Sequence, residues 1–122
     1  MMAFKDFYGN QADMYSFIYI PKFLMTSDIF SEIQNDSKII YGFLLDRMKL
    51  SLSNQWIDSH GRVCLIYPVK ELEKDIGMSR RKIMECLQEL KQAGLLEAEQ
   101  EGQVYTGLMY LKHITVEQSS DG

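Results

Sequence analysis

The stretch from Asp75 to Glu97 constrains this chain more than any other part of it. Gly77 predicts the end of one helix, and Ser79 can cap the next by accepting hydrogen bonds from backbone N–H groups. Apolar side chains then recur at three- and four-residue spacing and so share one helical face. They are Ile83, Cys86, Leu87 and Leu90. Gly94 suits the left-handed position just past a helix end. The stretch therefore predicts a short helix, a tight turn and a longer amphipathic helix.

The face opposite these apolar residues is polar and begins with three adjacent cations. A helix of this kind after a short helix and a glycine turn is typical of a recognition helix in the DNA major groove. Arginine can read guanine, glutamine can read adenine, and a helix N-terminus helps to hold a phosphate. The candidate DNA-binding residues are Ser79, Arg80, Arg81, Lys82, Glu85, Gln88 and Lys91. We expect Arg80 and Lys91 to contact phosphates and the four residues between them in this set to face base edges. The alternative is a solvated amphipathic helix.

Charge and composition narrow the function classes. The net charge of −4 argues against a protein that coats nucleic acid without selectivity, yet residues 79–93 carry four cations and two glutamates, a local charge of +2. The 122 residues favour one domain, and no apolar run is long enough to cross a membrane. The start of the chain does not have the pattern of a secretory signal. A cytoplasmic location is expected, with Cys64 and Cys86 as buried free thiols.

The sequence offers little for catalysis or for a bound cofactor. Asp58, His60 and Arg62 cluster in one segment, but a polar hairpin turn explains them and no nucleophile accompanies them. The paired short spacings of structural zinc sites and the glycine-rich loop of nucleotide-binding sites are both missing. We therefore predict no catalytic residues, no metal site and no cofactor. Arg62 is expected to pair with Asp58 or Asp46, and Asp46 with Arg47 could form a partly buried pair.

The remaining segments predict a mainly α fold with a small β sheet, arranged as a winged helix-turn-helix domain over residues 17–116. The expected elements are an N-terminal arm over 1–16, helices over 28–33, 37–53 and 69–76, a hairpin over 54–67, strands over 95–100 and 104–114, and a disordered tail over 117–122. The segment from Tyr15 to Ile20 is aromatic and β-branched, which favours a further strand. Tyr15, Phe17 and Tyr19 fall on one side of it and are candidate residues for self-association.

Three segments together resemble the N-terminal domain of the RepA-type plasmid replication initiators, the RepA_N family. They are YIPKFL at 19–24, SKIIYGFLLDRMKLSLSN at 37–54 and W-x-D-x-x-G-R-V from Trp56 to Val63. The resemblance implies a winged helix domain that binds repeated double-stranded DNA sites at a replication origin. It also implies a homodimer or larger assembly, and a further C-terminal domain that recruits replication machinery. That domain is not in this sequence, so a fragment or a short relative is expected.

The predicted wing departs from this pattern because it is acidic. Glu97, Glu99 and Glu101 stand where a wing lying on phosphates favours lysine or arginine. An alternative function is therefore a winged-helix protein-interaction module that uses the acidic wing and the aromatic segment on a protein partner, without strong DNA binding.

Overall fold

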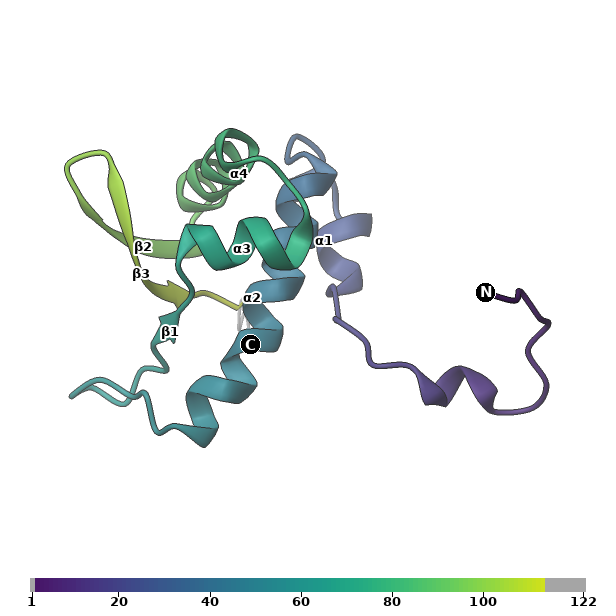
Figure 1. The fold of residues 1–122 in the computed structure, drawn as a ribbon. Coiled ribbons are helices and arrows are strands. Elements are labelled where there is room, and N and C mark those ends of the chain that lie inside the picture. Colours follow the sequence, from purple (N-terminus) through teal and green to yellow (C-terminus); the bar gives the residue numbers. More distant parts are fainter. Residues whose placement is uncertain (1, 114–122) are drawn as a thin grey trace, which may run out of the picture.

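The structure is a computed structural model that describes residues 2–113, so Ile114 and the tail predicted over 117–122 lie outside the described residues. The described residues form four α-helices, two short 3₁₀ helices and three strands (Figure 1). One strand lies between the second and third α-helices, and the other two follow the last helix. In chain order they are η1 (Gln11–Met14), α1 (Lys22–Thr26), η2 (Asp28–Phe30), α2 (Asn35–Ser53), β1 (Leu65–Ile66), α3 (Val69–Ile76), α4 (Arg80–Gln92), β2 (Leu96–Glu101) and β3 (Val104–Leu111). This is the winged-helix arrangement that the sequence predicts.

The core lies between α2, α3, α4 and the sheet. Helix α4 packs against both α2 and α3, and its C-terminal end leads directly into β2. Fully buried side chains from each helix meet there, among them Leu44 of α2, Leu72 of α3 and Leu87 of α4. Burying side chains of this size supplies about 1.5–3 kcal/mol each, so this cluster fixes how α4 sits on the other helices.

The sheet is antiparallel with the strand order β1-β3-β2, so β3 lies in the middle. Leu65 of β1 and Ala98 of β2 both pair with Met109 of β3, and Leu65 and Met109 are fully buried over the core. The register of β2 on β3 shifts between Ala98 and Gln100, which marks a bulge or other irregularity within the hairpin. The β2–β3 hairpin extends to one side of the helices as the wing (Figure 1).

The hairpin predicted over residues 54–67 forms only around its turn. Ile57 and Val63 form an isolated antiparallel bridge. Backbone hydrogen bonds from Asp58 to Arg62 and from Cys64 to Trp56 flank this bridge. The end of the predicted second strand is β1, which pairs instead with β3 of the wing. The Asp58 side chain accepts hydrogen bonds from the backbone N–H groups of His60 and Arg62, both at 2.9 Å, which closes a tight local loop. Leu65 lies beyond this short hairpin and is fully buried beside β3.

The strand predicted over Tyr15 to Ile20 is wrong. The segment is extended but joins no sheet within the described residues, and it runs across α2 at Gly42. A Cβ atom at Gly42 would lie 3.0 Å from Ile20 Cγ1, so the missing side chain allows this close approach. The aromatic and β-branched composition favours extended backbone, and here a helix surface takes the place of a partner strand. The sequence analysis did not predict α1. The helix that it expected over 28–33 is the shorter 3₁₀ helix η2, over Asp28–Phe30.

Candidate nucleic-acid interface

The start of α4 is built by a glycine turn and a serine cap, as the sequence predicts. Gly77 has a φ of 77° and ends α3, and its N–H donates to the carbonyl of Glu73. The Ser79 hydroxyl oxygen then accepts a hydrogen bond from the N–H of Lys82 at 3.2 Å. The cap satisfies one of the unpaired N–H groups of the first turn and fixes where the helix begins.

Replacing Ser79 with alanine is expected to lower the free energy of unfolding by about 1 kcal/mol, because the Lys82 N–H loses its partner. Urea denaturation followed by circular dichroism measures the change. Ser53→Ala is the matched control, since the Ser53 hydroxyl only donates back to the carbonyl of Lys49 at the exposed end of α2. Equal losses of unfolding free energy in the two variants would show that the Ser79 cap stabilises the domain no more than an ordinary surface serine does.

The back of α4 is buried and its front is exposed. Ile83, Cys86, Leu87 and Leu90 are all 0% exposed. On the opposite face Arg80, Arg81, Glu85 and Gln88 are exposed. Arg80 and Arg81 form no ion pair with any residue from 2 to 113, so both guanidinium groups of the first turn are available to an anion.

Lys82 differs from Arg80 and Arg81 because its ammonium group is bound by other side chains of the domain. Its ammonium lies 3.5 Å from the carboxylates of both Asp36 and Glu85, and it donates to the side-chain oxygen of Gln34. Burial alone would lower the pKa of Lys82, but the two carboxylates outweigh it, so the pKa is raised and the cation is stabilised. Lys82 therefore ties the first turn of α4 to the start of α2. No local pattern in the sequence predicts this contact, because it joins residues far apart in the chain.

The C-terminal half of the exposed face is held by the wing. The Tyr105 hydroxyl of β3 donates to Gln88 Oε1 at 3.1 Å. The Lys91 ammonium donates to Gln100 Oε1 at 2.6 Å and lies 5.6 Å from the centre of the Tyr105 ring. Gln88 and Lys91, two of the candidate DNA-binding residues, are thus joined to the hairpin. Sequence reasoning did not identify Tyr105 or Gln100 as part of this site.

The acidity of the wing is partly neutralised at its base. Glu97 pairs with Lys112 at 2.8 Å and with Arg62 at 3.4 Å, and first Lys112, then Arg62, lowers the pKa of Glu97. Glu99 and Glu101 are exposed and have no ion pair within residues 2–113. The unbalanced negative charge of the wing therefore lies in its outer part.

Arg62 supports the loop before β1, which confirms its predicted pairing with Asp58. Its Nε donates to Asp58 Oδ2 at 2.8 Å, and its guanidinium lies 4.1 Å from the centre of the Tyr110 ring. The side-chain hydrogen bond from Arg62 is the main reason that the pKa of Asp58 falls to about 2, and it raises the pKa of Arg62 in turn. This cluster is a structural support at the base of the wing.

The pairing of Asp46 with Arg47 is wrong. Arg47 hydrogen bonds to Glu71 of α3 and stacks 3.8 Å above the ring of Tyr67, whereas Asp46 lies 3.6 Å from Lys49. Successive side chains on a helix point in different directions, so neighbours in sequence rarely pair. Arg47 instead joins α2 to α3.

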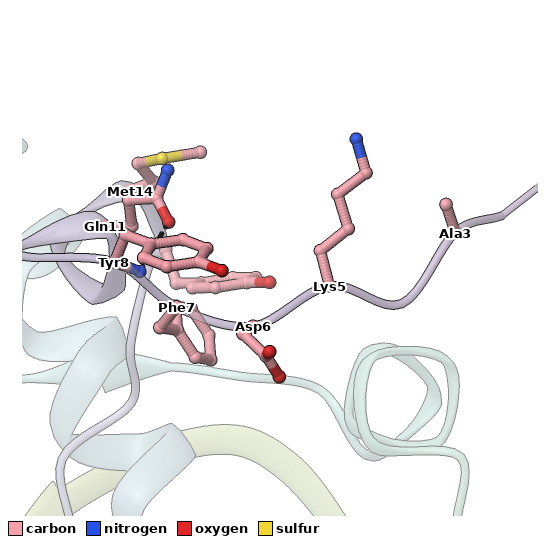
Figure 2. A pocket seen from close by; sticks show the side chains of 8 residues that line it. Ala3, Lys5, Asp6, Phe7, Tyr8, Gln11 and Met14 are labelled. Carbon is pink, nitrogen blue, oxygen red and sulfur yellow. Dashed lines mark hydrogen bonds between the residues drawn. The ribbon is translucent and has the colours of Figure 1, made fainter.

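The N-terminal arm lies apart from α4. Residues 2–17 are all exposed, and Figure 1 shows the arm leading away from the helices on the side opposite the wing. Figure 2 shows Phe7, Tyr8 and Met14 gathered at one end of a shallow pocket, with Lys5 further along the chain. The Phe7 and Tyr15 rings meet edge to face, 5.9 Å between centres.

The three residues predicted for self-association are exposed. Tyr15 is 61%, Phe17 49% and Tyr19 64% exposed, and the Phe17 and Tyr19 rings are 6.4 Å apart. The structure does not bring these residues together with the α4 face, so the chain has two separate candidate surfaces.

Other chemistry has little support in the described part of the chain. Cys86 is buried and Cys64 half-buried, both are free thiols, and burial raises the pKa of each. Across residues 2–113 no group of three His, Cys, Asp or Glu side chains converges as a metal site would require. No helix in the same range is long and apolar enough to span a membrane.

Three of the solved structures that this chain resembles share its fold with a TM-score of 0.74. One, described as the N-terminal domain of a DNA binding protein, is 28% identical, and the match covers 95% of this chain and 88% of that one. A structure of a Rep–DNA complex is also 28% identical, covering 93% and 88%. A structure of an MDR initiator is 30% identical, covering 93% and 90%.

The sequence comparisons agree with the fold. A curated relative, a 41 kDa protein of Lactobacillus helveticus, is 30% identical over 94 residues, which are 77% of this chain and 27% of that protein. The chain thus spans about a quarter of the relative's length. The family model for the N-terminus of replication initiator protein A (RepA) matches residues 16–121, which include all three segments of the resemblance seen in the sequence. This chain belongs to the RepA N-terminus family of replication initiator proteins.

Proposed function

We propose that this chain is a sequence-specific double-stranded DNA-binding domain that recognises repeated sites at the replication origin of a plasmid or mobile element. The observation that carries the proposal is the first turn of α4, where Arg80 and Arg81 are exposed and without ion pairs inside residues 2–113. One of the similar structures is a complex of a Rep protein with DNA, which supports the same use of the fold.

In this proposal α4 enters the major groove by its N-terminal half. Arg81, Glu85 and Gln88 face base edges, and Arg80 contacts a phosphate beside the capped first turn. Lys91 contacts a second phosphate from the end of the helix that the wing supports. Ser79 fixes the first turn. Lys82 must break its ion pairs with Asp36 and Glu85 before it can contact DNA. Its contribution to the affinity for DNA is therefore smaller than its charge suggests.

Selection of bound fragments from random duplex DNA, followed by gel shifts over a salt series, tests the proposal. We expect one enriched sequence and an affinity that falls steeply with salt, because each phosphate contact contributes about −0.9 to the slope of log K against log salt. Binding without any enriched sequence, or no dependence on salt, would contradict it.

We also infer that the chain self-associates through the Tyr15–Ile20 segment as a homodimer or larger assembly. Tyr15, Phe17 and Tyr19 support this inference because they expose aromatic surface where the arm joins the domain. Light scattering on the chain and on a variant with all three residues changed to serine tests it. A mass that stays at one chain at high concentration would contradict the inference.

A complete replication initiator has roles beyond DNA binding, and we propose that other regions carry them. Because the chain spans 27% of its curated relative, we propose that a region beyond it recruits replication machinery. We also propose that the protein acts in the cytoplasm, which two free thiols support. The domain boundaries of 17–116, with the arm over 1–16, are part of the same proposal. The proposed domain contains no catalytic residue and needs no cofactor.

The second candidate function is a protein-interaction module, which exposed Glu99 and Glu101 favour. Replacing both with lysine distinguishes the two candidates. If the wing lies near the duplex, the double variant is expected to bind DNA roughly two- to fivefold more tightly on all sequences, with a steeper salt dependence. Gel shifts on selected and scrambled duplexes measure this. The control is the double variant Asp6→Lys and Asp13→Lys in the exposed arm, which changes the charge by the same amount. Equal gains in the two double variants would show that the wing lies no nearer to the DNA than the arm does.

A further inference from the structure

Tyr105 links the wing to the base-facing side of α4 through one hydrogen bond. Its ring is buried, with 8% of the residue exposed, and its hydroxyl donates to Gln88 Oε1 at 3.1 Å. Gln88 itself is exposed on the face that we propose lies on DNA. The amide nitrogen of Gln88 has no hydrogen-bond partner within the described residues.

The Tyr105 hydroxyl carries its proton at neutral pH and can donate it to Gln88. Burial raises the pKa of Tyr105, so the hydroxyl keeps its proton. The Lys91 ammonium, 5.6 Å from the ring centre, and its bond to Gln100 hold the same end of the hairpin against α4. The tyrosine therefore stays in place as the amide of Gln88 meets a ligand.

This contact changes what Gln88 can read. A free glutamine reads adenine by offering a donor and an acceptor together to its N6 and N7 atoms. Tyr105 occupies one of the two acceptor sites of the Gln88 oxygen and holds that oxygen toward the wing. The two N–H donors of the nitrogen are then the part of the amide without a partner in the described part of the fold. Guanine presents two adjacent acceptors, O6 and N7, in the major groove, which both suit N–H donors. Thymine presents the single acceptor O4, adenine places its N7 acceptor beside the N6 donor, and cytosine presents the N4 donor.

We propose that Tyr105 is a positioning residue that turns the Gln88 amide so that its NH₂ group faces the DNA and selects guanine at the contacted base. This inference rests on the proposed function, because it assigns a specificity to one residue of the same interface.

The test compares base preferences selected from random duplexes by the wild-type chain, Tyr105→Phe and Gln88→Ala. We expect Tyr105→Phe to reduce discrimination by about two- to tenfold, the worth of one hydrogen bond, at the same single position that Gln88→Ala affects. In a Gln88→Ala background, Tyr105→Phe should then have no further effect at that position. Tyr41→Phe is the matched control, because the buried Tyr41 hydroxyl donates to the backbone carbonyl of Lys112 and not to a side chain of α4.

A second variant keeps the inference testable if Tyr105→Phe is poorly folded. In Gln88→Glu, Tyr105 can still donate to the side chain, but the carboxylate offers only acceptors to DNA. The preference at the affected position is expected to change to adenine or cytosine, whose exposed amino groups are donors.

The outcomes separate this inference from the proposed function. A wild-type chain that selects no sequence overturns both. Selective binding by the wild type, with Tyr105→Phe matching it at every position or losing affinity equally on all duplexes, overturns only the positioning role. An unchanged preference in Gln88→Glu does the same.

Discussion

Replacing Leu87 with alanine is expected to lower the free energy of unfolding by about 2–5 kcal/mol, the usual cost of emptying a fully buried leucine site. Leu87 is 0% exposed at the centre of the apolar face of α4, where the helix meets α2 and α3. Urea denaturation gives the change. A smaller fraction of folded chain should also weaken DNA binding at temperatures near the midpoint of unfolding.

The control for this prediction is Leu52→Ala. Leu52 lies on α2 and is 56% exposed, so the same chemical change should alter stability by less than about 1 kcal/mol. Similar losses in both variants would show that the back of α4 is not the buried support described here.

Arg81→Ala is expected to weaken binding to the selected DNA sequence by about 1–3 kcal/mol and to relax the preference at one base pair. Arg81 is exposed in the first turn of α4 and has no ion pair within residues 2–113, so the loss comes from contacts with DNA and not from the fold. Gel shifts on the selected duplex and on single-base variants of it measure both effects.

Arg80→Ala is the matched comparison one residue earlier. As a phosphate contact, Arg80 should lose affinity to a similar extent on every sequence and lower the salt slope by about 1. If Arg81→Ala behaves in the same way as Arg80→Ala, Arg81 is a phosphate contact and does not read a base.

Local patterns in the sequence predict the helix-turn-helix accurately. Gly77, Ser79 and the three- and four-residue spacing from Ile83 to Leu90 place α3, α4 and the turn between them, because caps and amphipathic faces are encoded within a few residues. The β2–β3 hairpin follows in the same way from two strand-like runs around Gly102. The fold class is confirmed by these elements.

Several contacts that the sequence analysis did not predict join residues far apart in the chain. Leu65 pairs with Met109 of β3, and Lys82 forms an ion pair with Asp36 at the start of α2. No periodicity in the sequence reports such pairings, because they depend on how the finished elements pack. The link between Tyr105 and Gln88 is of the same kind, since it exists only once the hairpin has folded back against α4.

The most direct test of the α4 interface is a titration of the isotope-labelled chain with its selected duplex, followed by NMR of the backbone amides. We expect the largest shift changes from Ser79 to Lys91 on the exposed face of α4. Small changes are expected in the arm, which leads away from the helices on the side opposite the wing (Figure 1). Saturable binding that shifts the arm or the outer wing and leaves the amides of Arg80, Arg81 and Gln88 unchanged would contradict the account.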